Sequence, residues 1–388
     1  MQVRQYRGKW VADYTDQFGK RHRPSFDTKR EATNHLVEAK SSIAGGAFRS
    51  EAAKTTVAAI TDLFIADCRE RVALGELGAA TSHNYIGHAE RYILGRSDLK
   101  APKHGEHEGQ FFKMPLGSLR LIDVDDQILE RFRRALITHG LARGTVKLVF
   151  VTLSQIFELA KRNRWIAQNP INQFKPPKTE RRETEVQIPE KDTLQKLIAC
   201  ATPYGQLLIT FAALTGLRSG EMRALMWKDI DWERSVVRVE RAIDRFGTLK
   251  SPKTTAGKRL VPLPAGLLKM LMDHRSRGKF DGLDDFVFGS GAGHPVHQST
   301  WISRIYNPAW NRLLATPAGQ GVKRCKWHAL RHFAVSSWNA KGVPLKRVQQ
   351  WVGHSSPQVT LNIYSHLFQA DGHTDAVEEI GAEFFSDN

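Results

Sequence analysis

The first fifty residues of the chain alternate hydrophobic and polar positions with the two-residue period of a β-strand. Three such runs are present, at Val3–Arg7, Trp10–Tyr14 and Lys20–Phe26. Gly8 and a later polar segment separate them as hairpin turns would. Thr28 and Glu31 then form the signature of a capping box, which predicts a helix continuing to about Ala39. We therefore expect residues 1–50 to form a three-stranded β-sheet with one helix.

Helical spacing of hydrophobic residues replaces this alternation between Val57 and Asn169. The clearest stripe steps by four, three and four residues, through Val149, Leu153, Ile156 and Ala160. Asn169-Pro170 is predicted to close that helix, because the residue before a proline disfavours helical backbone angles. We expect a helical domain over residues 55–172, preceded by a linker that begins at Gly45-Gly46.

The segment Lys100–Gly117 lacks any periodicity and is predicted to be an exposed loop. His104, Glu106 and His107 lie in it, but their spacing matches no recognised set of metal ligands. We interpret them as solvated side chains and expect no metal.

A basic linker is predicted over residues 161–182. It holds seven Lys or Arg residues against a single Glu, and its prolines, Pro170, Pro176 and Pro177, would keep it extended. An extended, positively charged linker between two globular units would allow the two units to close around duplex DNA. Most charge runs are simply solvated, so the linker supports this interpretation without proving it.

Residues 183–388 are predicted to form a mixed α/β domain. A buried helix at Tyr204–Leu214 ends at Gly216, and strands at 236–239 and 258–263 belong to a small antiparallel sheet. Three further helices are expected, one with His328 and Arg331 that runs to Lys341, one that ends at Gly353, and one that begins at Ser356-Pro357. The whole chain is then multidomain and mainly α-helical, with small antiparallel β-sheets.

Composition narrows the class of protein. A chain of 388 residues suggests two or three domains, and 41% hydrophobic with 25% charged residues is typical of a soluble globular protein. No apolar run approaches the roughly 18 residues of a membrane span. The N-terminus lacks a secretory signal, and three scattered cysteines suit a reducing compartment, so we expect a cytoplasmic protein.

The net charge of +17 makes nucleic acid the leading partner. The candidate chemistry agrees with that partner. Arg218, His328, Arg331 and His354 are cations able to neutralise a phosphate, and Tyr364 offers a hydroxyl able to attack it. Such a site cuts a phosphodiester without a metal, and we expect no cofactor.

These residues stand in a specific context. Thr215-Gly216-Leu217-Arg218 is followed by Glu221, His328-Ala329-Leu330-Arg331-His332 by Gly353-His354, and Thr360-Leu361-Asn362-Ile363 by Tyr364. The segment Lys326–Leu367 resembles the catalytic signature of the tyrosine recombinases, the phage integrase family. Residues 1–50 resemble the small arm-type DNA-binding domain at the head of many integrases, although an ordinary β-hairpin module remains the alternative.

The resemblance implies a role for each residue. Tyr364 is the nucleophile, Arg218, His328, Arg331 and His354 bind the phosphate, and Glu221 supports that network. Lys253, between the two strands, is implied as the acid that protonates the leaving 5′ hydroxyl. Lys250 and Lys258 remain open as alternatives. Residues 55–172 would be the core-binding domain and residues 183–388 the catalytic domain.

The family also implies a reaction and its partners. Tyr364 would remain on the 3′ phosphate, and a hydroxyl of a second duplex would then attack that link. Four protomers would act on double-stranded DNA at attachment sites, to integrate or excise a prophage or genomic island. A DNA-bending host factor and an excisionase are expected as accessory proteins.

Two other activities and one segment stay open. A type IB topoisomerase uses similar chemistry, and a non-catalytic DNA-binding regulator would also exploit the positive charge. The acidic tail, Ala370–Asn388, contains six acidic residues and no Lys or Arg. Our hypothesis is that it packs against a neighbouring catalytic domain, and a disordered end is the alternative.

Overall fold

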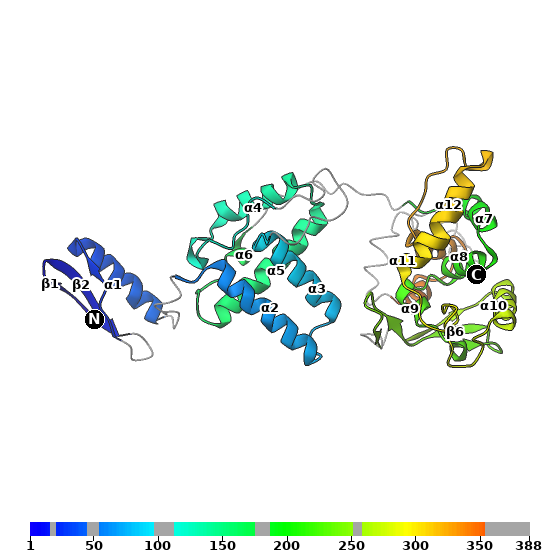
Figure 1. The fold of residues 1–388 in the computed structure, drawn as a ribbon, viewed down its shortest axis with the longest axis horizontal. Coiled ribbons are helices and arrows are strands. Elements are labelled where there is room, and N and C mark those ends of the chain that lie inside the picture. The colour runs from blue at the N-terminus through cyan, green and yellow to red at the C-terminus, as the bar shows by residue number, and fades with distance from the viewer. Residues whose placement is uncertain (16–20, 45–53, 97–111, 175–186, 251–257, 354–388) are drawn as a thin grey trace, which may run out of the picture. The chain divides into compact units, whose positions relative to one another are not determined.

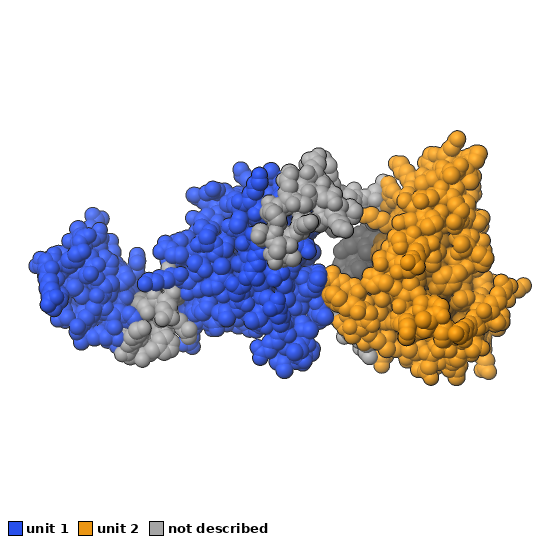
Figure 2. Space-filling view, in the orientation of Figure 1, with its two compact units in different colours: residues 1–181 blue, residues 182–388 orange. Residues whose placement is uncertain are grey.

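The computed structural model describes residues 1–15, 21–44, 54–96, 112–174, 187–250 and 258–353 (Figure 1). The chain divides into two compact units, residues 1–181 and 182–388, which Figure 2 shows in blue and orange. None of the helices in the described ranges is long and apolar enough to cross a bilayer.

A small antiparallel sheet with one helix begins the first unit. Its elements are β1 (Gln2–Tyr6), β2 (Lys9–Thr15), β3 (Arg21–His22), β4 (Ser25–Phe26) and α1 (Lys29–Ala44). β2 is central, pairing with β1 on one side and with both β3 and β4 on the other. The expected third strand is thus split in two, because Pro24 between the halves has no N–H to donate to the ladder. Ala12, Tyr14, Leu36 and Ala39 form the buried core between sheet and helix.

The local signals for these elements are confirmed. The Glu31 N–H donates to the Thr28 hydroxyl, and the Thr28 N–H donates to the Glu31 carboxylate, both at 3.2 Å. This is the capping box expected from the sequence, although α1 continues five residues beyond Ala39 to Ala44. Arg7 and Gly8 both have positive φ, as the tight turn between β1 and β2 requires.

Helices make up the rest of this unit. They are α2 (Val57–Ala73), α3 (Ala79–His88), a π-helix (Ala89–Ile93), a 3₁₀ turn (Leu121–Asp123), α4 (Asp126–Thr138), α5 (Arg143–Arg162) and α6 (Pro170–Gln173). The stripe predicted on α5 is confirmed, because Val149, Leu153, Ile156 and Ala160 are all fully buried. These residues pack in one core with residues of α2, such as Ile60 and Phe64.

Three expectations for this region were wrong: the end of helix α5, the exposed loop and the extended linker. Helix α5 ends at Arg162, and Asn169 instead caps α6 by accepting the Ile171 N–H, with Pro170 in the first helical position. The end of the expected loop is not exposed, because Phe112 and Leu116 are buried in the helical core.

The expected linker is likewise folded over its first part. Residues 161–174 belong to α5, to the following turn and to α6, and the side chains of Trp165 and Phe174 pack against the helical core. Pro176 and Pro177, like the three residues considered as metal ligands, lie outside the described residues.

The second unit combines helices with short strands. Its helices are α7 (Lys191–Ala199), α8 (Pro203–Thr215), α9 (Ser219–Arg223), α10 (Ala265–Arg277), α11 (Gln298–Trp301), a π-helix (Ile302–Tyr306), α12 (Asn307–Leu314), α13 (Ala329–Ala340) and α14 (Leu345–Val352). Two 3₁₀ turns lie at Trp227–Asp229 and Pro317–Gly319. The strands are β5 (Ile230–Asp231), β6 (Val236–Val239), β7 (Ala242–Ile243), β8 (Leu249–Lys250) and β9 (Arg259–Pro262).

The predicted sheet and buried helix of this unit are confirmed. β6 pairs antiparallel with β5 and β9, with Val237 opposite Val261. Helix α8 is buried over most of its length and ends at Gly216 in the left-handed conformation. The core is rich in aromatic side chains, among them Trp227, Trp301 and Trp310. The fold is therefore mainly helical with small antiparallel sheets, as the sequence predicted.

Candidate active site

Arg218 lies in the tight turn between α8 and α9. Gly216 makes the turn with a φ of 60°, and a Cβ added there would lie 3.2 Å from the Ala334 Cβ of α13. Glycine is needed for both the backbone angle and the close packing of α8 on α13. Arg218 follows as the N-cap of α9, with its side chain 44% exposed and therefore accessible to a ligand.

Arg331 and His328 lie at the start of α13. His328 is the N-cap of this helix rather than an interior residue, and Arg331 lies in the first turn. The Arg331 guanidinium is 4% exposed and donates to two backbone carbonyls, Gly216 O at 2.5 Å and Val352 O at 2.7 Å. The contacts join three segments that are far apart in the sequence: the α8–α9 turn, α13 and the end of α14.

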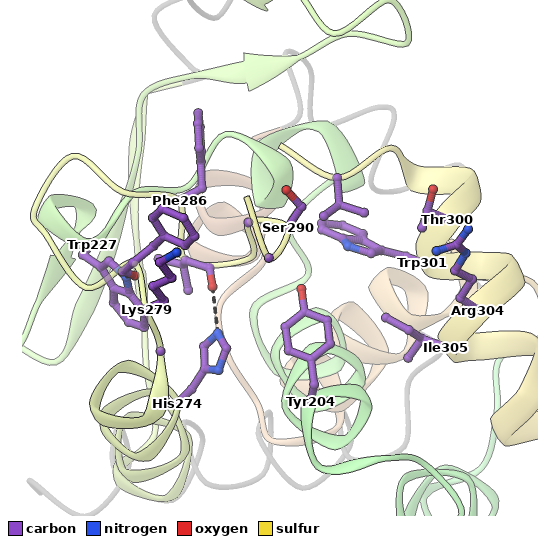
Figure 3. A pocket seen from close by; sticks show the side chains of 16 residues that line it. Tyr204, Trp227, His274, Lys279, Phe286, Ser290, Thr300, Trp301, Arg304 and Ile305 are labelled. Atoms are coloured by element: carbon purple, nitrogen blue, oxygen red, sulfur yellow. Dashed lines mark hydrogen bonds between the residues drawn. The ribbon is translucent and has the colours of Figure 1, made fainter. Parts of the chain in front are cut away.

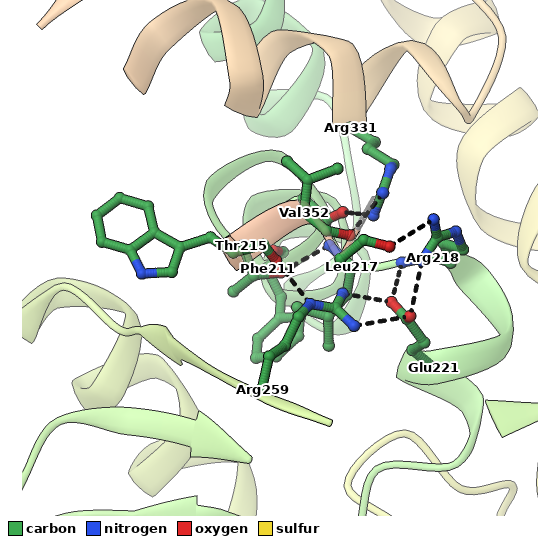
Figure 4. A network of polar contacts seen from close by, with 11 residues as sticks. Phe211, Thr215, Leu217, Arg218, Glu221, Arg259, Arg331 and Val352 are labelled. Atoms are coloured by element: carbon green, nitrogen blue, oxygen red, sulfur yellow. Dashed lines mark hydrogen bonds and ion pairs between the residues drawn. The ribbon is translucent and has the colours of Figure 1, made fainter. Parts of the chain in front are cut away.

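The C-terminal end of α14 is held by guanidinium groups. Arg259 Nε donates to Trp351 O at 2.7 Å, Arg331 to Val352 O, and Arg218 Nη2 to Gly353 O at 3.1 Å. Three successive carbonyls thus receive hydrogen bonds from three different arginines, part of which Figure 4 shows. The last carbonyls of a helix lack partners within it and carry partial negative charge, so cations stabilise them.

Glu221 is the buried anion of this cluster. Its carboxylate accepts from the Arg218 backbone N–H at 2.8 Å, from Arg218 Nη1 at 3.1 Å, and from both terminal nitrogens of Arg259. Burial by itself raises the pKa of Glu221, but the hydrogen bonds and charge of Arg259, with those of Arg218, hold the pKa below its usual value. The acid is therefore ionised beside both arginines (Figure 4).

Sequence reasoning missed Arg259. A signal for it exists, since Arg259 and Val261 on β9 alternate with Leu263 just after the strand, and the last two are buried. An arginine in register with core positions predicts a buried charge with a partner.

Other candidates fall outside the described residues. Lys253, His354 and Tyr364 are among them, as are the helix expected at Ser356-Pro357 and the acidic tail. Of the alternative lysines, Lys250 Nζ makes an ion pair with Asp244 at 2.6 Å, and Lys258 is exposed just before β9.

Two histidines at the start of α13 are in ring contact. The rings of His328 and His332 meet edge to face with centroids 5.0 Å apart. Burial, followed by the charges of Arg331 and Arg218, lowers the pKa of His328. Burial, then His328 and Arg331, lowers the pKa of His332 to about 4. Both imidazoles are therefore neutral near pH 7. His328 is close enough to Arg331 and Arg218 for their positive charges to lower its pKa.

His332 should make the fold acid-sensitive. Its pKa is lower folded than unfolded, so the unfolded chain binds more protons between about pH 6.5 and 4, and stability is lost as pH falls through this window. We expect His332→Gln to reduce the drop in thermal midpoint between pH 7.5 and 5. His294→Gln, at an exposed site, is the control. An identical drop in the parent chain and in His332→Gln would contradict this assignment.

A separate cavity of about 550 Å³ lies elsewhere in the second unit. It is lined mostly by apolar and aromatic side chains, including Trp227, Phe286 and Trp301 (Figure 3). It shares no lining residue with the arginine cluster. Within the described part of the chain, no group of three or more His, Cys, Asp or Glu residues is placed to hold a metal ion.

Comparison with known proteins identifies the class. The phage integrase family model matches residues 188–371. A tyrosine recombinase XerC-like protein of Caldanaerobacter subterraneus subsp. tengcongensis is 28% identical over 333 residues, 79% of this chain and 78% of the relative. The ICEBs1 integrase of Bacillus subtilis is 28% identical over 61% of this chain and 65% of the relative.

Solved structures share the fold. The Tn1549 transposon integrase in complex with a circular intermediate DNA has a TM-score of 0.64 at 18% identity, covering 84% of this chain and 99% of that one. A lambda integrase tetramer bound to a Holliday junction has a TM-score of 0.56 at 18% identity, covering 92% and 96%. Residues 188–371 therefore match the phage integrase family, and the chain is similar to tyrosine recombinases and integrases over most of its length. It is a site-specific DNA recombinase, which cleaves and rejoins DNA.

Proposed function

We propose that this recombinase cleaves DNA with Tyr364, which stays on the 3′ phosphate while the 5′ hydroxyl leaves. Arg218, His328, Arg331 and His354 hold the scissile phosphate. The observation that carries this assignment is the meeting of the α8–α9 turn, α13 and the end of α14 in one hydrogen-bonded cluster. His354 directly follows Gly353, whose carbonyl is one of the bonded atoms.

The chemistry follows from the charges. Attack by a phenol on a phosphodiester places extra negative charge on the non-bridging oxygens, and fixed guanidinium groups stabilise that charge. Neutral His328 can donate one N–H to the phosphate, and its pKa would rise beside the anion. The phenol has a reference pKa of about 10, so the same guanidinium groups favour its deprotonation.

Lys253 remains our proposed acid for the leaving 5′ hydroxyl. The ion pair between Lys250 and Asp244 supports the choice, because it occupies Lys250 with a carboxylate. Lys258 is the remaining alternative. Glu221 is proposed as a supporting residue, consistent with its direct bonds to Arg218.

The substrate and assembly are proposed from the relatives. Several of these are integrases of phages or mobile elements, and solved neighbours include a tetramer on a Holliday junction. We infer that four protomers act on two duplexes at attachment sites to integrate or excise a mobile element. A DNA-bending factor and an excisionase are the expected accessory proteins, and the reaction takes place in the cytoplasm. Residues 1–50, 55–172 and 183–388 would be the arm-binding, core-binding and catalytic domains.

A nicked suicide substrate tests the proposal. When a short fragment ending in the 5′ hydroxyl diffuses away after cleavage, rejoining stops and the covalent adduct accumulates. We expect an adduct that peptide mapping assigns to Tyr364, formed without ATP and in the presence of EDTA. An adduct on another residue would refute the assignment. Recombinant junctions between two plasmids, rather than relaxation of one, separate the enzyme from a topoisomerase.

The N-terminal sheet should act in integration rather than in cleavage. Arg4, Arg21 and Arg23 all form ion pairs with the buried Asp13, so this group of four side chains carries a net charge of +2. A positive charge on so small a sheet favours contact with DNA phosphates. Deleting residues 1–50 is expected to leave cleavage of a core site intact and to lower integration at least tenfold, through lost arm-site contacts. Integration and core-site cleavage are measured in parallel. Unchanged integration would show that the module has another role.

A further inference from the structure

Arg259 is, with Arg331, one of the two cations of the arginine cluster whose side chains are buried. It lies at the start of β9 with a side chain 4% exposed, and it donates Nη1 and Nη2 to the two oxygens of Glu221 at 2.9 and 2.8 Å. Its Nε donates to Trp351 O at 2.7 Å. One guanidinium thus links β9, α9 and the end of α14 (Figure 4).

Glu221 stands between two arginines with different surroundings. Arg218 is 44% exposed and makes one side-chain contact to the carboxylate, whereas Arg259 is buried and bidentate. Paired, planar hydrogen bonds are the stronger arrangement for a carboxylate. Arg259 therefore neutralises most of the Glu221 charge, and the positive charge of Arg218 stays available to a ligand.

The same guanidinium fits against the turn that follows α14. Gly353 ends the helix with a φ of 70°, and a Cβ added there would lie 2.9 Å from Arg259 Nη1. Both the backbone angle and this contact require glycine. Arg259 therefore packs directly against Gly353, the residue that precedes His354 in the sequence.

We propose that Arg259 is a positioning residue for the phosphate-binding arginine. It satisfies Glu221, so that this acid orients Arg218 without cancelling its charge. The proposal rests on the assignment of Arg218 to the scissile phosphate. Without Arg259, the buried carboxylate would pair with Arg218 alone and compete with the DNA phosphate for it.

The rate of adduct formation at saturating DNA tests this role. We expect Arg259→Gln to lower the rate constant about tenfold or more, and Arg259→Lys to lower it less, because lysine keeps the charge but not the fork. In the Glu221→Gln background, Arg259→Gln should lower the rate constant less than about threefold, since no carboxylate then competes for Arg218. Arg238→Gln, on the exposed face of the adjacent β6, is the matched control and should keep the parental rate.

A substrate with an uncharged scissile group separates positioning from folding. A methylphosphonate lacks the negative charge that Arg218 binds, so the ratio of the Arg259→Gln rate to the parental rate should approach one. A general structural defect would lower the rate of adduct formation on both substrates by the same factor. Circular dichroism and DNA affinity establish that each variant is folded at the assay temperature.

The outcomes distinguish this proposal from the proposed function. An Arg259→Gln rate within twofold of the parent on the phosphate substrate overturns the role of Arg259, as does an equal loss in the Glu221→Gln background. Adduct formation by Tyr364→Phe would instead overturn the nucleophile assignment, whatever the Arg259 variants show.

Discussion

Tyr364→Phe is expected to bind DNA with parental affinity and to form no covalent adduct. The substitution removes only the phenolic oxygen, which is the atom that we propose bonds to phosphorus. The aromatic ring is retained, so we expect the fold and the DNA contacts not to change. Denaturing gels of the suicide substrate measure the adduct, and a gel-shift titration measures the affinity.

Tyr204→Phe provides the matched control for this variant. Tyr204 lies on α8 in the same unit and lines the apolar cavity, apart from the arginine cluster. Its hydroxyl has no hydrogen-bond partner among the described residues. This variant should form the adduct at the parental rate. A residual adduct from Tyr364→Phe would mean that another nucleophile performs the cleavage.

Arg331→Ala should lower the rate of adduct formation by a factor of roughly 10² to 10³, the effect of losing one donor to a developing oxyanion. Arg331 is buried and bonded to Gly216 O and Val352 O, so its guanidinium is held in place before DNA binds. Fixed donors stabilise the transition state without reorganisation. Arg218→Ala should show a loss on the same scale.

Arg331→Lys distinguishes charge from geometry. A lysine retains the charge but lacks the planar set of N–H donors of a guanidinium. It therefore cannot hydrogen-bond to Gly216 O, to Val352 O and to the phosphate at the same time. We expect it to remain well below the parental rate. Arg347→Ala, at an exposed position of α14, is the control and should be near parental at saturating DNA. Near-parental cleavage by Arg331→Ala would remove Arg331 from the site.

Local signals in the sequence predicted many of the elements. The capping box at Thr28, the buried stripe on α5 and the glycine ends of α8 and α14 all appear in the structure. Each depends on side chains within a few residues of one another, which the sequence shows directly.

Features set by distant contacts were harder to predict. The sequence predicts that Pro170 closes α5, but in the structure it starts α6, since its missing N–H is compatible with either position. Phe112 and Leu116 lie in a segment without periodicity that the sequence predicts to be an exposed loop, yet the helical core buries them. The burial of an isolated side chain depends on which surface faces it.

The sequence by itself indicated the resemblance to the phage integrases, the mainly helical fold and the chemical types of the proposed catalytic residues, because motifs and periodicity are local. Only the tertiary structure decided that Arg218, Arg331 and Arg259 converge on three successive carbonyls at the C-terminal end of α14. It also placed Glu221 between a buried and an exposed arginine. Such pairings join residues separated by up to 135 positions, and their energy depends on burial and geometry that spacing along the chain does not encode.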